Sequence, residues 1–77
     1  MERTLEAAFG KVLKTTREER GMSQEDLSFE AGLHRTYVSL LERGRNAPSI
    51  RALWALAQAL DVRPSELIRG VERHFQA

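Results

Sequence analysis

Cysteine is absent from this 77-residue sequence, and histidine occurs only twice, at His34 and His74. Disulfide bonds and thiolate metal sites are therefore excluded, and two histidines so far apart do not suggest a metal cluster. No apolar run approaches the roughly 20 residues that a membrane-spanning helix needs, and no signal peptide opens the chain. We therefore expect a cytoplasmic protein that uses no membrane, metal or other cofactor.

A strong charge of either sign is also lacking, because the net charge is +1. The sum does not indicate a nucleic-acid partner, but the distribution of charge is uneven. Residues 21–34 carry three acidic side chains and no lysine or arginine, whereas residues 35–51 carry four arginines against Glu42 alone. Taken alone, such a cluster is most often a solvated surface. Its meaning depends on where the helices place it.

A chain of 77 residues with 42% hydrophobic and 30% charged residues is typical of one folded domain. No segment alternates as a β-strand does, and short turn signals divide the chain into five helical segments. We therefore predict that residues 1–77 form a single all-α domain. Its architecture is expected to be a compact five-helix bundle that contains a helix-turn-helix at residues 23–43.

Helix ends and apolar faces can be assigned for the first two segments. Gly21 ends the first, and Ser23 caps the second, with Asp26 placed as in a capping box. Leu27 and Ala31 would face inward from the second helix. The first helix is expected to turn one face inward, consisting of Leu5, Phe9, Val12, Leu13 and Thr16.

The third segment, residues 34–43, lies between Gly32 and Gly44. Ser49 caps a fourth helix, and Pro64 suits the first position of a fifth. Gly70 lies within the fifth segment and weakens the signal for a continuous helix there. The broad apolar side of the fourth helix comprises Ile50, Leu53, Trp54, Leu56, Ala57 and Leu60. The apolar stripe of the fifth comprises Leu67, Ile68, Val71 and Phe75.

The third segment has two contrasting faces when its residues are placed at about 100° intervals. One arc holds the apolar residues Tyr37, Val38, Leu40 and Leu41. The complementary arc holds Arg35, Thr36, Ser39, Glu42 and Arg43. One face can thus pack in a core while the other presents guanidinium and hydroxyl groups. A helix that reads the DNA major groove needs this division.

Three residues of this face are predicted to contact DNA bases: Arg35, Thr36 and Ser39. Arg35 and Thr36 lie in the first turn, the end that is expected to point at base edges. Arginine can pair bidentately with guanine, and threonine can bond a base or set its methyl against thymine. Ser39 lies one turn further and could touch a base or a phosphate. Ordinary surface positions are the alternative for all three.

Contacts with the DNA backbone are predicted for a second set of residues, on the argument that arginines and helix amino termini attract phosphates. The set comprises Arg17, Gln24, Tyr37, Arg43, Arg45 and Asn46. Gln24 could instead brace the recognition helix, and Tyr37 could simply pack in the core. Glu42 is expected to pair with an arginine or to cap nearby amides rather than to contact DNA.

Residues 21–62 resemble the Cro/CI-type (XRE) helix-turn-helix family. The shared features are Gln24 opening the second helix, the Ala31-Gly32 turn, Glu42-Arg43-Gly44 after the third helix and Pro48-Ser49 before the fourth. The resemblance implies a lambda-repressor-like DNA-binding fold, with phosphate or bracing work for Gln24. It also implies base or backbone contacts from residues 35–39 and backbone contacts from the loop that holds Arg45 and Asn46. The length and the Arg35-Thr36-Tyr37 triplet are similar to the controller proteins of restriction–modification systems.

A homodimer is expected, because one recognition helix reads too few base pairs to select a site in a genome. Two such helices about 34 Å apart would read a palindrome. The C-terminal helices, residues 49–75, would supply the interface through Trp54, Leu67, Ile68, Val71 and Phe75. The alternative is that all of this apolar surface lies in the core of one subunit.

These patterns together predict a regulator of transcription, a repressor or an activator, that binds a specific double-stranded DNA sequence. No phosphate-binding loop, metal-ligand spacing or nucleophile–base pair indicates an enzyme, and no small-molecule effector site is evident. The alternative is a protein-interaction module, such as an antitoxin or adaptor, built on the same bundle.

Overall fold

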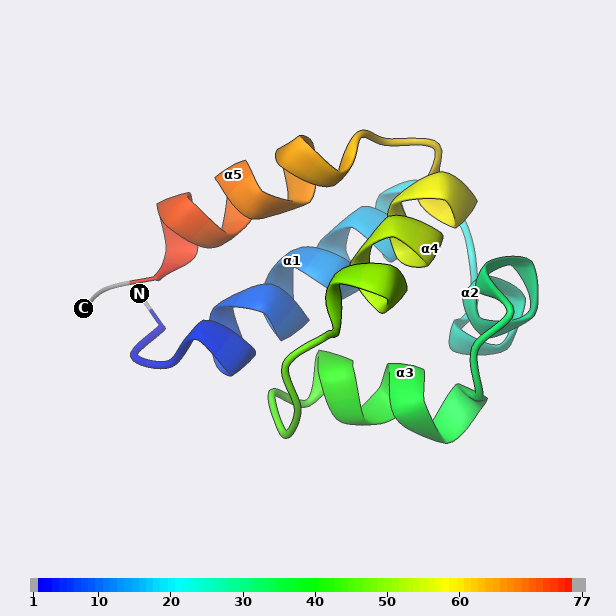
Figure 1. Cartoon of the computed structure of the whole chain (residues 1–77), viewed down its shortest axis with the longest axis horizontal. Helices are drawn as coiled ribbons and strands as arrows, with labels where there is room; N and C mark the ends of the chain where they lie inside the picture. The colour runs from blue at the N-terminus through cyan, green and yellow to red at the C-terminus, as the bar shows by residue number, and fades with distance from the viewer. Residues whose placement is uncertain (1, 76–77) are drawn as a thin grey trace.

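Polar caps and glycines set the ends of five α-helices in the computed structural model, which describes residues 2–75 (Figure 1). The helices are α1 (Leu5–Glu19), α2 (Gln24–Ala31), α3 (Arg35–Glu42), α4 (Ile50–Leu60) and α5 (Pro64–His74). The expected all-α, five-helix architecture is confirmed. None of these helices in the described part of the chain combines the length and the apolar character needed to traverse a membrane.

Hydroxyl side chains cap free amides at the amino ends of three helices, α1, α2 and α4. Thr4 Oγ1 accepts a hydrogen bond from the amide of Ala7 in α1 at 3.0 Å, and Ser49 Oγ accepts one from α4 at 3.0 Å. At α2, Ser23 Oγ accepts from the Asp26 amide at 2.9 Å and the Ser23 amide donates to the Asp26 carboxylate at 3.0 Å. The predicted capping box is therefore present, and its hydrogen bonds lower the pKa of Asp26.

Two of the turns depend on glycine because the backbone is left-handed there. Gly32, between α2 and α3, has φ of 67°, and Gly44, which follows α3, has φ of 72°. Gly44 also lies against α1, since a Cβ there would come within 3.0 Å of the Cα of Ala7. Helix α3 is thus held by a sharp turn at each end.

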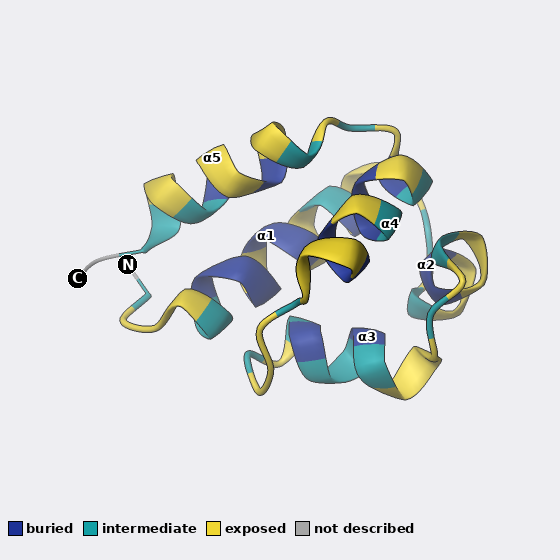
Figure 2. Cartoon of the chain, viewed as in Figure 1, coloured by how far each residue is buried: buried dark blue, intermediate teal, exposed yellow. Residues whose placement is uncertain are grey.

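The core lies between the helices, and each of the five contributes to it (Figure 2). Its buried members are Phe9, Val12, Leu13, Leu27, Val38, Leu41, Leu53, Leu56, Ala57, Leu60 and Leu67. α1 runs beside α5 and also packs on α3, while α4 packs on α2. The two ends of the described segment, residues 2–75, lie close together beside the α1–α5 pair, where the amide of Glu2 donates to the carbonyl oxygen of His74 at 2.7 Å (Figure 1).

Two expectations about apolar faces were wrong. Leu5 and Ile50, both expected to face inward, are 55% and 71% exposed because each lies in the first turn of its helix, beyond the packed surface. α5 continues unbroken through Gly70. A Cβ at Gly70 would lie 2.8 Å from Cγ1 of Val12, so glycine here allows α5 to approach α1 closely.

A second close approach, at Gly10, brings the backbone of α1 against the end of α3. A Cβ at Gly10 would lie 2.5 Å from the carbonyl oxygen of Leu41 and 2.7 Å from that of Glu42. These neighbours are backbone atoms, so rotation of a side chain cannot relieve the contact. The position of α3 therefore depends on the absence of a side chain at Gly10.

We predict that Gly10→Ala destabilises the protein despite the higher helix propensity of alanine. Overpacking of this kind costs about 1–3 kcal/mol of unfolding free energy, which urea unfolding followed by circular dichroism would measure. Thr15→Ala, at an exposed position of the same helix, is the matched control and should cost little. Equal stability of the two variants would show that α1 and α3 are not in close contact.

Candidate nucleic-acid interface

The exposed face of α3 carries the residues that were expected to read DNA bases. Arg35 and Thr36 are exposed, and Ser39, one turn further, is half-buried. On the opposite side, Val38 and Leu41 are fully buried in the core. The helix therefore lies at the edge of the bundle with its polar first turn toward solvent (Figures 1 and 2).

His34 caps this helix, a role that the sequence analysis did not assign. Its Nδ1 accepts a hydrogen bond from the amide of Thr36 at 3.2 Å. The cap begins α3 at Arg35, so Arg35 and Thr36 occupy the first turn as expected. An imidazole can replace the usual serine or aspartate at this position because an unprotonated ring nitrogen is also an acceptor. The sequence signal was a polar residue directly before the helical pattern.

Glu42 joins three helices instead of facing solvent. Nε and Nη2 of Arg17 in α1 donate to the two Glu42 carboxylate oxygens at 2.6 Å and 3.1 Å, and Gln24 Nε2 in α2 donates to the carboxylate at 3.0 Å. Arg17 Nη1 donates to the carbonyl oxygen of Met22 at 2.8 Å. The expected pairing of Glu42 with an arginine is confirmed. The prediction that Glu42 lies on the solvent-facing arc of the helix was wrong, since its side chain is only 3% exposed.

Arg17 therefore has a different role from the predicted phosphate contact. Its guanidinium donates hydrogen bonds to the Glu42 carboxylate and to the Met22 carbonyl oxygen, and its side chain is only 11% exposed. The hydrogen bond to Glu42 raises the pKa of Arg17, so the guanidinium keeps its positive charge. Arg17 is therefore not available for a DNA contact. Gln24 braces α3 through Glu42, which is one of the two roles expected for it.

The charge that remains exposed around α3 is positive. Glu42 is the only acidic residue among residues 35–51, and its charge is paired with Arg17. Arg35, Arg43 and Arg45 are all exposed, as is Asn46 in the loop after α3. Tyr37 is half-buried and packs against the core, so only part of its side chain is accessible. A surface of this kind favours a polyanionic partner.

The residues expected at a dimer interface divide into three groups by exposure. Trp54 and Ile68 are 53% and 45% exposed and line an open apolar hollow between α4 and α5 together with Ile50. Val71 and Phe75 are half-buried. Leu67 was wrong as an interface residue: it is 1% exposed and lies inside the core of this chain.

Helices α2 and α3, joined by the turn at Gly32, form a helix-turn-helix, the unit that places its second helix in the DNA major groove. A helix-turn-helix family model matches residues 13–67. The chain belongs to this helix-turn-helix family, of the Cro/CI (XRE) type that its sequence resembles.

Similar proteins include restriction–modification controllers. The control protein C.BamHI of Bacillus amyloliquefaciens is 38% identical over 69 residues, which cover 88% of this chain and 85% of that protein. The crystal structure of the controller protein C.AhdI from Aeromonas hydrophila matches 80% of this chain and 94% of its own, with 44% identity and a TM-score of 0.79. The controller protein C.Esp1396I, solved as a tetramer with its natural 35 base-pair operator, matches 95% of this chain and 96% of its own, with 32% identity and a TM-score of 0.83.

We predict that Glu42→Ala strongly destabilises the fold. The substitution leaves the Arg17 guanidinium buried without its counter-charge, which typically costs about 3–5 kcal/mol, as urea unfolding would measure. Glu18→Ala, at an exposed position of α1, is the control. The double variant Arg17→Met/Glu42→Leu should recover much of the loss, because it removes both charges. If Glu42→Ala is as stable as Glu18→Ala, the pair does not hold the three helices.

Proposed function

We propose that this protein is a transcription regulator that binds a specific double-stranded DNA sequence as a homodimer. Residues 1–77 act as one DNA-binding domain in the cytoplasm, with α3 in the major groove of each half of a palindromic operator. The observation that carries the proposal is the exposed first turn of α3, which holds Arg35 and Thr36, while Arg43 and Arg45 are exposed after the other end of the helix. The operator complex of C.Esp1396I supports it.

Base recognition is assigned to the amino-terminal half of α3. Arg35 pairs with a guanine, and Thr36 contacts the neighbouring base. Ser39 is half-buried and reaches a base only where α3 lies deepest in the groove. The exposed arginines, rather than exposed apolar side chains, on this face favour DNA over a protein partner as its ligand.

Backbone contacts are assigned to residues that flank α3. Arg43, Arg45 and Asn46 are exposed at its carboxyl end and in the following loop. Tyr37 contributes its hydroxyl, while its ring packs on the core. Gln24 donates one amide hydrogen to Glu42 and has a second one for a phosphate. Such contacts fix the position of the helix on the duplex without reading sequence.

We predict that Arg35→Ala lowers affinity for the selected operator by about 1–3 kcal/mol and relaxes preference at one base pair. Selection from a random duplex pool, followed by titration of the enriched sequence at fixed salt, would measure both effects. Arg45→Ala should weaken all duplexes alike and reduce the log–log salt slope by about 0.9.

Arg63→Ala, at an exposed position before α5, is the matched control for loss of one positive charge. It should leave both the preference and the salt slope almost unchanged. If Arg35→Ala selects the same operator as the unmodified protein, Arg35 does not read a base.

The apolar hollow between α4 and α5 is assigned to the dimer interface. Ile50, Trp54 and Ile68 expose apolar surface there, and Leu53 and Pro64 complete the lining. A two-fold contact through this hollow buries the same residues on both subunits. We assign the half-buried residues Val71 and Phe75 to the margin of this dimer interface.

We predict that Ile68→Asp weakens dimerisation by at least about 2 kcal/mol, because it places a charge in an apolar interface. Sedimentation across a dilution series would measure this, and Trp54 fluorescence should change as the unmodified protein dissociates. Phe29→Ala, which truncates an exposed aromatic residue of α2, is the control and should dimerise normally. If Ile68→Asp dimerises as tightly as the unmodified protein, the dimer interface lies elsewhere.

A further inference from the structure

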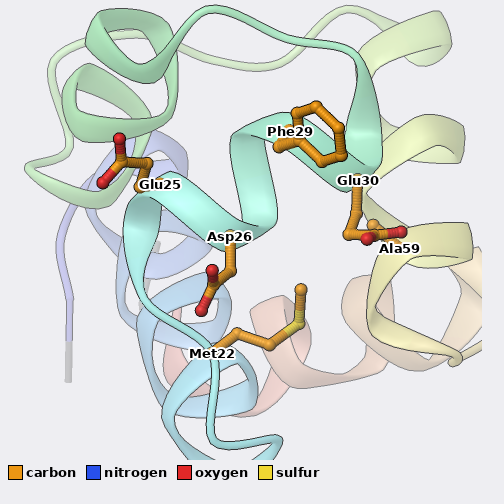
Figure 3. A pocket seen from close by; sticks show the side chains of 6 residues that line it. All are labelled: Met22, Glu25, Asp26, Phe29, Glu30 and Ala59. Atoms are coloured by element: carbon orange, nitrogen blue, oxygen red, sulfur yellow. The ribbon is translucent and has the colours of Figure 1, made fainter.

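Two open hollows with apolar surface lie on this chain, and they differ in the charge of their margins. The first lies beside α2, where Met22, Phe29 and Ala59 supply the apolar surface. Its margin carries three exposed carboxylates, those of Glu25, Asp26 and Glu30 (Figure 3). Residues 21–34 contain no lysine or arginine to offset them. A two-fold contact through this hollow would bring the carboxylates against identical ones, which repels a second copy of the chain.

The second hollow, of about 440 Å³, lies between α4 and α5 and contains Trp54; we call it the Trp54 hollow. Two charged residues of α5, Arg69 and Glu72, line its apolar surface, and both are exposed. This margin therefore carries one charge of each sign. Under a two-fold axis, each of these groups in one copy can meet the opposite charge in the other. The Trp54 hollow is thus self-complementary in charge, whereas the hollow beside α2 is not.

Arg69 and Glu72 do not pair with each other in this chain. Their spacing places them about 60° apart around α5 and about 4.5 Å apart along its axis, which permits an ion pair within a helix. Among residues 2–75, however, ion pairs join Lys11 to Glu2 and Arg17 to Glu42, and neither charged residue of the Trp54 hollow takes part in one. Both groups are therefore available to a second molecule.

We propose that Arg69 and Glu72 select a second copy of this chain as the partner at the Trp54 hollow. The guanidinium of Arg69 in one subunit pairs with the carboxylate of Glu72 in the other, and the two-fold axis repeats the pair. This inference rests on the proposed homodimer. It adds which charged groups determine the choice of partner.

The two pairs act on specificity more than on affinity. Ion pairs at a margin open to solvent add little affinity, whereas like charges brought together there are unfavourable. The apolar residues Ile50, Trp54 and Ile68 supply the attraction. A chain of the same fold with two acidic or two basic residues at the margin would form one repulsive contact for each attractive one. It would therefore be disfavoured as a partner.

The test exchanges the two charges between subunits. Arg69→Glu gives a margin with two carboxylates and Glu72→Arg gives one with two cations, so each homodimer should be about tenfold weaker than that of the unmodified protein. In an equimolar mixture of the two variants, every carboxylate meets a cation. The heterodimer should then form about nine-tenths of the dimers, against about one half for equal affinities. Native mass spectrometry would measure these shares.

Two further measurements separate local pairs from general attraction. Lys14→Glu and Glu18→Lys make the same changes of charge at exposed positions of α1, outside the Trp54 hollow. Their mixture should contain only the statistical share of heterodimer. The double variant Arg69→Glu/Glu72→Arg restores both pairs within one chain and should dimerise as tightly as the unmodified protein. Circular dichroism would check that each variant is folded.

A statistical share of heterodimer in the mixture of Arg69→Glu and Glu72→Arg would overturn this inference. So would a double variant that dimerises as weakly as the single variants. If Ile68→Asp weakens dimerisation in either case, the proposed homodimer stands and only the charge selection fails. An unmodified protein that stays monomeric, or a dimer insensitive to Ile68→Asp, would contradict both.

Discussion

The buried ion pair between Arg17 and Glu42 is the contact on which the functional surface depends. It joins α1 to the last residue of α3, and Gln24 adds α2 to the same carboxylate. A buried pair of this kind contributes little net stability compared with apolar packing, but it penalises any arrangement that separates the charges. In this protein, it fixes how α2 and α3 sit on α1, which is the geometry that a groove-reading helix needs. Gly10 complements it by allowing the two backbones to touch.

The same pair decides the sign of the surface around α3. Glu42 would otherwise place a negative charge among Arg35, Arg43 and Arg45. Its partner removes that charge from solvent, whereas the carboxylates of α2 remain exposed on a different arc. A net charge of +1 thus conceals two oppositely charged surfaces on neighbouring helices. Local fields of this kind direct partners to separate sites more effectively than total charge does.

Local features of the structure were predictable from sequence because short-range interactions determine them. The capping box at Ser23, the glycine after each helix of the helix-turn-helix, and the two faces of α3 involve residues only a few positions apart. The family resemblance followed from the same segment and was confirmed.

Features set by contacts between distant segments were less accessible. Arg17 was predicted to contact phosphate because its partner in the fold, Glu42, lies 25 residues away in the sequence. Leu67 and Ile68 are neighbours with similar hydrophobicity, yet one is buried and the other is 45% exposed, because successive residues point about 100° apart and only packing fixes the rotation of α5. The sequence gives no reason for a glycine at position 70, because the residue that it packs against, Val12, belongs to a distant segment. Such relations require knowledge of which helices meet.

The hydrogen bond between Glu2 and His74 brings together segments from the two ends of the described chain. A short linker between the segments at residues 2 and 75 would close the described part of the chain into a ring. New ends could then be opened in the turn between α4 and α5, away from the helix-turn-helix, because chain breaks are best tolerated in exposed connections. The packing of the five helices in space should therefore not require the order in which they follow one another along the chain.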